Sequence, residues 1–163
     1  MRIAVRHEVA ASPARAIAAY GSPAFYTGRA ETDDIAVLEV VRHEDQGERV
    51  LMEVRFAFTG SLSAAVRAVI DPAKMSWVTR TEVRPAESRT DWVVLPDHYP
   101  DRLTAAGTYA FAAGGDPDST VVTVEGDLKV HVPIVGRSVE RAIVSGLSRY
   151  IEDEVASIPS LAP

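Results

Sequence analysis

The stretch EGDLKVHVPIVGRSVERAIVSGLSRYIEDEVASI, residues 125–158, changes its hydrophobic period in the middle. Before Pro133, apolar residues stand at every second position, which is typical of a strand with one buried face. After Pro133 they recur at every third or fourth position, which is typical of an amphipathic helix. The stretch therefore predicts one long strand that leads almost directly into one long helix.

Both predicted elements are strongly one-sided. The strand begins upstream of the quoted stretch, and its apolar face comprises Val122, Val124, Gly126, Leu128, Val130 and Val132. The stripe of the helix comprises Val139, Ala142, Ile143, Leu147, Tyr150, Ile151, Val155 and Ile158. We expect this helix to run for about five turns and to end at Pro159.

The start of the chain predicts a strand followed by two short helices. Residues 2–10 alternate between apolar and polar side chains, as a strand with one solvated face requires. Ser12 is a typical N-cap, and Pro13 suits the first helical position, where its missing N–H costs nothing. The same Ser-Pro signal recurs at Ser22, before Gly28.

Further strands are predicted over residues 34–43, 48–58, 75–83, 89–95 and 103–113. Asp45, Gln46 and Gly47 are typical of a hairpin turn between the first two. The segment SLSAAVRAVIDP begins with Ser and ends with Pro, which favours a short helix, with an irregular strand as the alternative. The apolar face of that helix would comprise Leu62, Val66, Val69 and Ile70.

Composition excludes several classes of protein. The 163 residues suit one domain over 1–163, and no apolar run is long enough to span a membrane. A net charge of -6 without a basic stripe argues against nucleic acid as a partner. The absence of cysteine excludes disulfides and thiolate chemistry. The start of the sequence does not read as a secretory signal, so we expect a cytoplasmic protein.

The order of the elements indicates an α+β fold, in which a curved antiparallel sheet of about seven strands wraps around the C-terminal helix. This order, with VPIVGRSVE at the junction, resembles the helix-grip (SRPBCC) superfamily of START-like lipid-binding domains, polyketide cyclases and plant pollen-allergen-like proteins. Val132, Pro133, Gly136 and Glu140 further resemble the junction of a family of uncharacterised actinobacterial proteins. The resemblance implies binding of a lipid, sterol, polyketide or other bulky apolar molecule between sheet and helix, and carries no catalytic residue.

The strand around Trp77 can face the interior in two ways. Either Trp77, Thr79 and Thr81 point inward, or Arg80 and its neighbour Glu82 do. We favour Trp77 inward, because burying an indole gains more free energy than burying an unpaired Arg. The residues expected to line a ligand cavity are Met52, Val54, Phe56, Trp77, Thr79, Trp92, Tyr109, Phe111, Ile143, Gly146, Leu147 and Tyr150. The same residues could instead pack a solid core.

Two acidic features have alternative interpretations. Glu39 shares a face with Ile35, Val37 and Val41 in one register of its strand, and would then be buried. The other register, which we favour, leaves Glu39 in water. The acidic run at residues 152–154 is typical of a solvated helix face.

Three functions are compatible with the sequence. The first is binding of a hydrophobic small molecule in a cavity that opens near the two short helices and residues 62–70. The second is a cyclase- or hydrolase-like enzyme that uses Tyr109, Arg80 or Glu39 as acid or base. The third is a structural protein with a filled core. Within the first, Gly146 would either border the cavity or admit a bulky residue of the sheet.

The sequence predicts no metal site and no other cofactor. Its histidines are scattered singly, without the spacing of metal ligands. They are His7, His43, His98 and His131. The oligomeric state and the identity of a ligand have no signal in the sequence.

Overall fold

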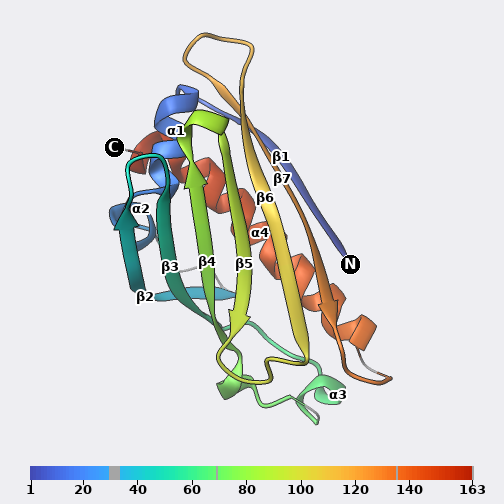
Figure 1. Cartoon of the computed structure of the whole chain (residues 1–163). Coiled ribbons are helices and arrows are strands. Elements are labelled where there is room, and N and C mark those ends of the chain that lie inside the picture. Colours follow the sequence, from blue (N-terminus) through green and yellow to red (C-terminus); the bar gives the residue numbers. More distant parts are fainter. Residues whose placement is uncertain (30–33, 69, 135, 163) are drawn as a thin grey trace.

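Figure 1 shows a computed structural model of the chain, which describes residues 1–29, 34–68, 70–134 and 136–162. Across these residues, seven strands form one antiparallel sheet in the order β1-β7-β6-β5-β4-β3-β2. The strands are β1 (Arg2–Val9), β2 (Ile35–Asp45), β3 (Val50–Phe58), β4 (Ser76–Arg84), β5 (Arg89–Pro96), β6 (Leu103–Ala113) and β7 (Thr120–Val130). The helices are α1 (Pro13–Tyr20), α2 (Pro23–Thr27), α3 (Ala64–Arg67) and α4 (Gly136–Leu161), with short 3-10 turns η1 (Pro72–Lys74) and η2 (Pro85–Glu87). The predicted α+β architecture is confirmed.

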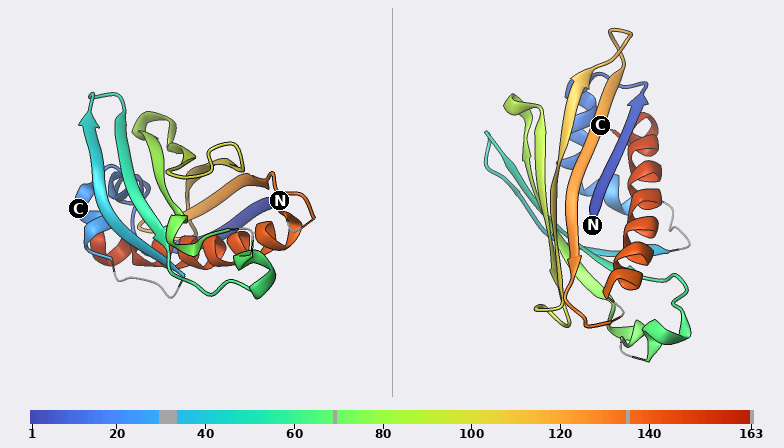
Figure 2. Two further views of the ribbon diagram at one scale, coloured as in Figure 1. Left: turned by 90° about the horizontal axis from the view of Figure 1, so that it is seen from below. Right: turned by 90° about the vertical axis from the view of Figure 1, so that its right-hand side faces the viewer.

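The sheet is curved, and α4 lies across its concave face (Figures 1 and 2). β1 and β2 are the two edges of the sheet, although they are consecutive strands in the sequence. Helices α1 and α2 connect these edges, and they lie near the C-terminal end of α4 (Figure 1). The short helix α3 lies at the opposite end of the sheet (Figure 1). The space between the sheet and α4 therefore has α1 and α2 at one end and α3 at the other.

Helix α4 is longer than the sequence predicts. It has 26 residues, or about seven turns, and Pro159 lies inside its last turn instead of ending it. A proline removes one backbone donor, but here the Ala162 N–H still donates to the Ile158 oxygen at 2.8 Å. Ala142, expected on the buried stripe, is exposed at its margin. The other buried apolar residues of α4, among them Val139 and Tyr150, follow the predicted spacing.

The junction between β7 and α4 depends on Gly136 and Glu140. A Cβ at position 136 would lie 3.0 Å from the Val130 carbonyl oxygen, so the helix starts close against the end of the strand. Glu140 is buried, and its Oε1 accepts a hydrogen bond from the Val130 N–H at 2.9 Å. This hydrogen bond lowers the pKa of the Glu140 carboxyl. Gly136 and Glu140 thus hold the start of α4 against the end of β7.

Strand β2 follows neither of the two registers that its sequence allows. Its pairing with β3 shifts between Val37 and Glu39 and again between Val40 and Arg42. Each shift leaves one residue of β2 without a paired residue on β3: Leu38 at the first shift and Val41 at the second. Both are exposed. Such bulges insert an extra residue and move the following side chains to the other face. Glu39 is therefore in water, as expected, although the favoured register does not hold over the whole strand.

The helix predicted from SLSAAVRAVIDP is shorter than expected. It forms as α3, and Ser63 caps it by accepting a hydrogen bond from the Val66 N–H. Chain direction then changes at Pro72, where η1 begins. Val69, predicted on the apolar face of this helix, lies outside the described residues.

A pair of glycines makes room for Trp92 on the concave face. Gly107 of β6 and Gly126 of β7 are paired across the two strands. A Cβ at either position would lie 2.6 Å from Cζ2 of Trp92, so the indole lies directly over bare backbone. The Trp92 indole nitrogen is buried and has no hydrogen-bond partner among the described residues.

We expect Gly107→Ala to lower the free energy of unfolding by about 1–3 kcal/mol, because the added methyl group would collide with Trp92 and with the Glu125 carbonyl. Urea denaturation measures this loss. Gly115→Ala is the matched control, since the nearest atom to a Cβ there is Glu8 Oε1, at 3.7 Å. The control should change stability by less than about 0.5 kcal/mol. Equal losses in both variants would contradict a tight fit of Trp92.

Candidate functional site

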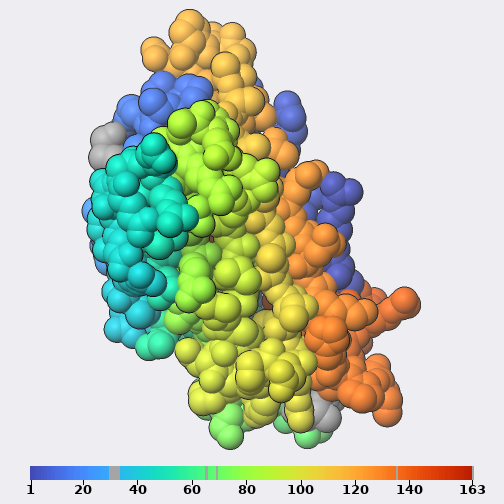
Figure 3. Space-filling view, in the orientation of Figure 1, coloured from blue at the N-terminus to red at the C-terminus, as the bar shows by residue number. Residues whose placement is uncertain are grey.

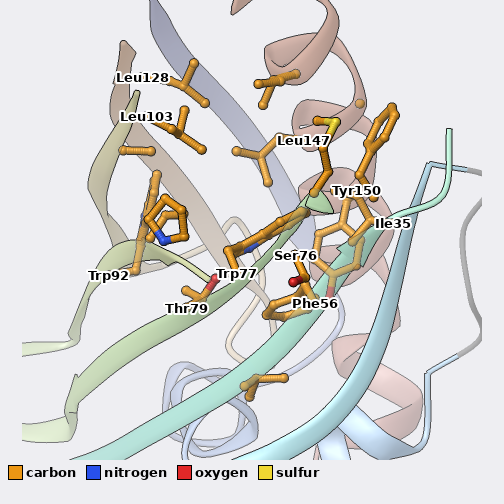
Figure 4. A pocket seen from close by; sticks show the side chains of 18 of the residues that line it. Ile35, Phe56, Ser76, Trp77, Thr79, Trp92, Leu103, Leu128, Leu147 and Tyr150 are labelled. Carbon is orange, nitrogen blue, oxygen red and sulfur yellow. The ribbon is translucent and has the colours of Figure 1, made fainter. Parts of the chain in front are cut away.

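A cavity of about 140 Å³ lies between the concave face of the sheet and α4 (Figure 4). Its walls are formed mainly by β3–β7 and α4. Of the residues predicted to line it, the structure places these at its wall: Val54, Phe56, Trp77, Thr79, Trp92, Tyr109, Ile143, Gly146, Leu147 and Tyr150. The cavity argues against a core without a void, which is the alternative interpretation of these residues.

Met52 and Phe111, also predicted at the wall, do not line the cavity. Both are buried in the core. The Phe111 ring lies 5.5 Å from the ring of Tyr20, so α1 covers the sheet at this position. Alternation in the sequence identifies which face of a strand is buried, but does not show how far along the strand the cavity extends.

The wall of the cavity is largely aromatic on one side. Trp77 stacks on Phe56 with ring centroids 5.9 Å apart, and the Tyr150 ring meets the edge of Phe56 at 5.6 Å. Figure 4 shows Phe56, Trp77 and Tyr150 gathered between β3, β4 and α4. Trp77 therefore faces inward, as predicted, and Thr79 lines the cavity beside it.

Two of the acid or base candidates lie outside the cavity. Arg80 is exposed and pairs with Glu53 at 2.7 Å, and Glu39 is exposed and pairs with Arg55 at 2.7 Å. Both pairs connect neighbouring strands. These residues cannot act on a ligand in the cavity, so this part of the enzyme hypothesis is wrong. Tyr109, the third candidate, does line the cavity.

A buried ion pair closes the end of the cavity next to α1 and α2. Arg29 Nη1 lies 2.7 Å from Glu154 Oε1, and each side chain is only 4% exposed. Tyr109 donates its hydroxyl hydrogen to Glu154 Oε2 at 2.8 Å. Arg29 also donates to the Tyr150 hydroxyl oxygen at 2.7 Å, and its guanidinium lies 4.3 Å from the centre of that ring. Opposite charges are thus neutralised inside the protein.

Further phenols surround this pair, and we call the whole group the inner cluster. It comprises Arg29, Glu154, Tyr20, Tyr26, Tyr109 and Tyr150. Burial raises the pKa of each of its four phenols, and the charge of the Glu154 carboxylate raises them further. Burial acts most strongly on Arg29 and lowers its pKa, but Glu154 and the neighbouring phenols together outweigh this effect, and the pKa is raised. The phenols therefore stay protonated and Arg29 stays charged at physiological pH.

The acidic run at residues 152–154 predicts a solvated helix face, which would place Glu154 in water. The structure corrects this: Glu154 is buried, whereas Glu152 and Asp153 are exposed. Its position gives a signal, since it stands four residues after Tyr150 and four before Ile158, both on the apolar stripe. Arg29, just after Gly28, gives no comparable signal.

The opposite end of the cavity is its mouth, formed by Lys74, His98 and Arg102. All three line the cavity and are exposed. The inner cluster is buried by contrast, so the opening lies at η1 and the β5–β6 loop. The sequence predicts an opening near the two short helices and residues 62–70, and Ile70 of that segment does line the cavity. The helices instead close the inner end, because Tyr20 and Tyr26 turn their rings into the core.

In the described ranges no group of three or more His, Asp or Glu residues is placed to hold a metal ion. None of the helices described has the length and hydropathy needed to cross a membrane.

Comparisons with known proteins identify a family and a fold. A family model described as "Protein of unknown function (DUF2505)" matches residues 4–159. No curated protein matches the sequence. Similar solved structures include the protein TTHA0849 from Thermus thermophilus, with a TM-score of 0.65, 15% identity and coverage of 97% of this chain and 94% of that one.

Two other similar structures are the Zhui aromatase/cyclase from Streptomyces sp. R1128 and a START superfamily protein from Mycobacterium smegmatis. The first has a TM-score of 0.63 and 12% identity, and covers 97% of this chain and 92% of its own. The second has a TM-score of 0.58 and 17% identity, and covers 99% of each chain. The predicted START-like helix-grip fold is confirmed. The narrower resemblance to an actinobacterial family stays a prediction.

Glu154→Gln should lower the free energy of unfolding by about 3–5 kcal/mol, because it leaves the Arg29 charge buried without a partner. Glu152→Gln, on the exposed side of the same helix, should have almost no effect. Thermal and urea denaturation measure both. If Glu154→Gln is too unstable to isolate, Arg29→Met/Glu154→Leu should still fold, since it removes both charges together. A Glu154→Gln variant as stable as Glu152→Gln would contradict the burial of this pair.

Proposed function

This chain belongs to the DUF2505 family, and we propose that it binds a small apolar molecule in the cavity between the sheet and α4. The observation that carries the proposal is a largely apolar cavity of about 140 Å³ between the sheet and α4. A dry apolar cavity of about 150 Å³ is large enough for benzene. A ring or a short chain therefore fits within the walls, and a longer molecule would extend through the mouth. We further propose that residues 1–163 act as one domain.

The inner cluster supports binding of a group that is uncharged at its buried end. Glu154 is already neutralised by Arg29, and a second charge beside this pair would lose its hydration without gaining a partner. The phenol hydroxyls and Thr79 offer hydrogen bonds to a neutral polar atom. A mostly apolar wall with a few polar groups is the usual composition of a small-molecule site.

An enzyme that transfers protons is less well supported. A general acid or base works best when its pKa is near the pH of the reaction. The buried phenols have pKa values raised away from neutrality, and the Glu154 carboxylate is engaged by Arg29 and Tyr109. The aromatase/cyclase has the same fold, but 12% identity extends no reaction to this chain.

Gly146→Leu tests the cavity directly. Gly146 lines it, and the nearest atom to an added Cβ is 3.5 Å away, on Asp34, so the position accepts a side chain without a clash. We expect the further carbons of the leucine to occupy part of the cavity. We expect this variant to retain its stability within about 1 kcal/mol. Its affinity for the neutral fluorescent probe N-phenyl-1-naphthylamine should fall by about tenfold or more, because the probe and the leucine compete for one space.

Ala142→Leu is the control, since it adds a larger side chain to the exposed side of α4. Probe affinity should be unchanged in this variant. The proposal would be overturned if the wild-type protein does not bind the probe. It would also be overturned if the wild type and Gly146→Leu bind the probe with equal affinity. Native mass spectrometry of freshly purified protein would then show whether any other molecule is carried.

A further inference from the structure

The mouth of the cavity carries a charge opposite to that of the whole protein. The chain has a net charge of -6, yet Lys74 and Arg102 both line the opening. His98 adds a third nitrogen-bearing side chain there. Among the described residues that line the cavity, the carboxylate is that of Glu154, which lies at the far end and is neutralised by Arg29.

Most arginines elsewhere on the sheet form ion pairs with acidic side chains. Among the described residues, the arginines on or beside the sheet that form an ion pair with a nearby Asp or Glu are Arg2, Arg42, Arg49, Arg55, Arg80, Arg84 and Arg89. Within the part of the chain that the structure describes, neither Lys74 nor Arg102 forms such a pair. The Arg102 guanidinium instead lies 5.2 Å from the ring centre of Tyr99, which also lines the cavity. This contact holds a cation at the opening and leaves its hydrogen-bond donors available.

Two acidic residues near the mouth, Asp97 and Asp71, are engaged in other contacts. Asp97 accepts a hydrogen bond from Ser76 at 2.7 Å and pairs with Arg55 at 3.3 Å. Asp71 accepts the Ala73 N–H at 3.0 Å and so caps η1. Asp101 is in the same loop as Arg102 but does not line the cavity. The charged side chains that line the opening itself are therefore Lys74 and Arg102.

From this asymmetry we infer that the ligand is an amphiphile with one anionic head group, such as a carboxylate, sulfonate or phosphate. Its apolar body occupies the cavity, and its head group lies at the mouth between Lys74 and Arg102. An anion is excluded from the inner end, because the charge of Arg29 is already matched by Glu154. The inference rests on the proposed function and specifies its ligand class.

Two probes that share one ring system separate charge from apolar contact. The anionic probe is 8-anilinonaphthalene-1-sulfonate, and the neutral probe is N-phenyl-1-naphthylamine. In Lys74→Gln/Arg102→Gln, affinity for the sulfonate should fall by about three- to tenfold, as expected for the loss of two partly exposed charges. Affinity for the neutral probe should change by less than about twofold. Raising sodium chloride from about 0.05 M to about 0.5 M should weaken only the sulfonate, and only in the wild type.

Arg6→Gln/Arg80→Gln is the matched control, because it removes two exposed charges that do not line the cavity. It should leave both affinities unchanged. Equal loss of sulfonate binding in the control, or equal loss of both probes in the mouth variant, would overturn the inference. If the wild type binds the neutral probe but sulfonate affinity does not depend on Lys74 and Arg102, the head-group inference alone fails. If the wild type binds neither probe, the proposed function itself fails.

Discussion

The ion pair between Arg29 and Glu154 is the constraint on which the arrangement of the helices depends. Two side chains that are each 4% exposed can be charged only if they are enclosed together and every strong hydrogen-bonding atom is used. Meeting this condition brings α4 to the segment after α2 and to Tyr109 of β6. It also fixes the rotation of α4 about its axis, because Glu154 must point toward the sheet. The cavity remains where the sheet curves away from this contact.

The sequence allows the path of the chain to be predicted further than the chemistry of its interior. Alternation in β7, the change of period after Pro133 and the Ser-Pro starts of α1 and α2 all give local signals, and local signals determine elements. Gly136 and Glu140 were recognised only as a resemblance. Their physical role is now clear, since one permits close approach to Val130 and the other binds its N–H.

The unpredicted features all depend on contacts between residues far apart in the sequence. Glu154 keeps its charge in the interior because Arg29 reaches it from a segment 125 residues away; its place on the apolar stripe indicates burial but not this partner. Phe111 is removed from the cavity by α1, which crosses the sheet above it. The position of the mouth depends on which loops leave the end of the cavity uncovered. Such facts follow from how elements are placed together, which hydrophobic periodicity does not encode.

The convex face of the sheet, shown in Figure 3, is crossed by ion pairs between neighbouring strands, and its outer strand β2 is an edge. Edge strands offer unpaired backbone groups on which a second chain can add. The two bulges of β2 interrupt its regular spacing of donors and acceptors. They also turn Leu38 and Val41 out of the ladder. An incoming strand would find no continuous register on this edge, so the bulges act as protection against fibrillar aggregation.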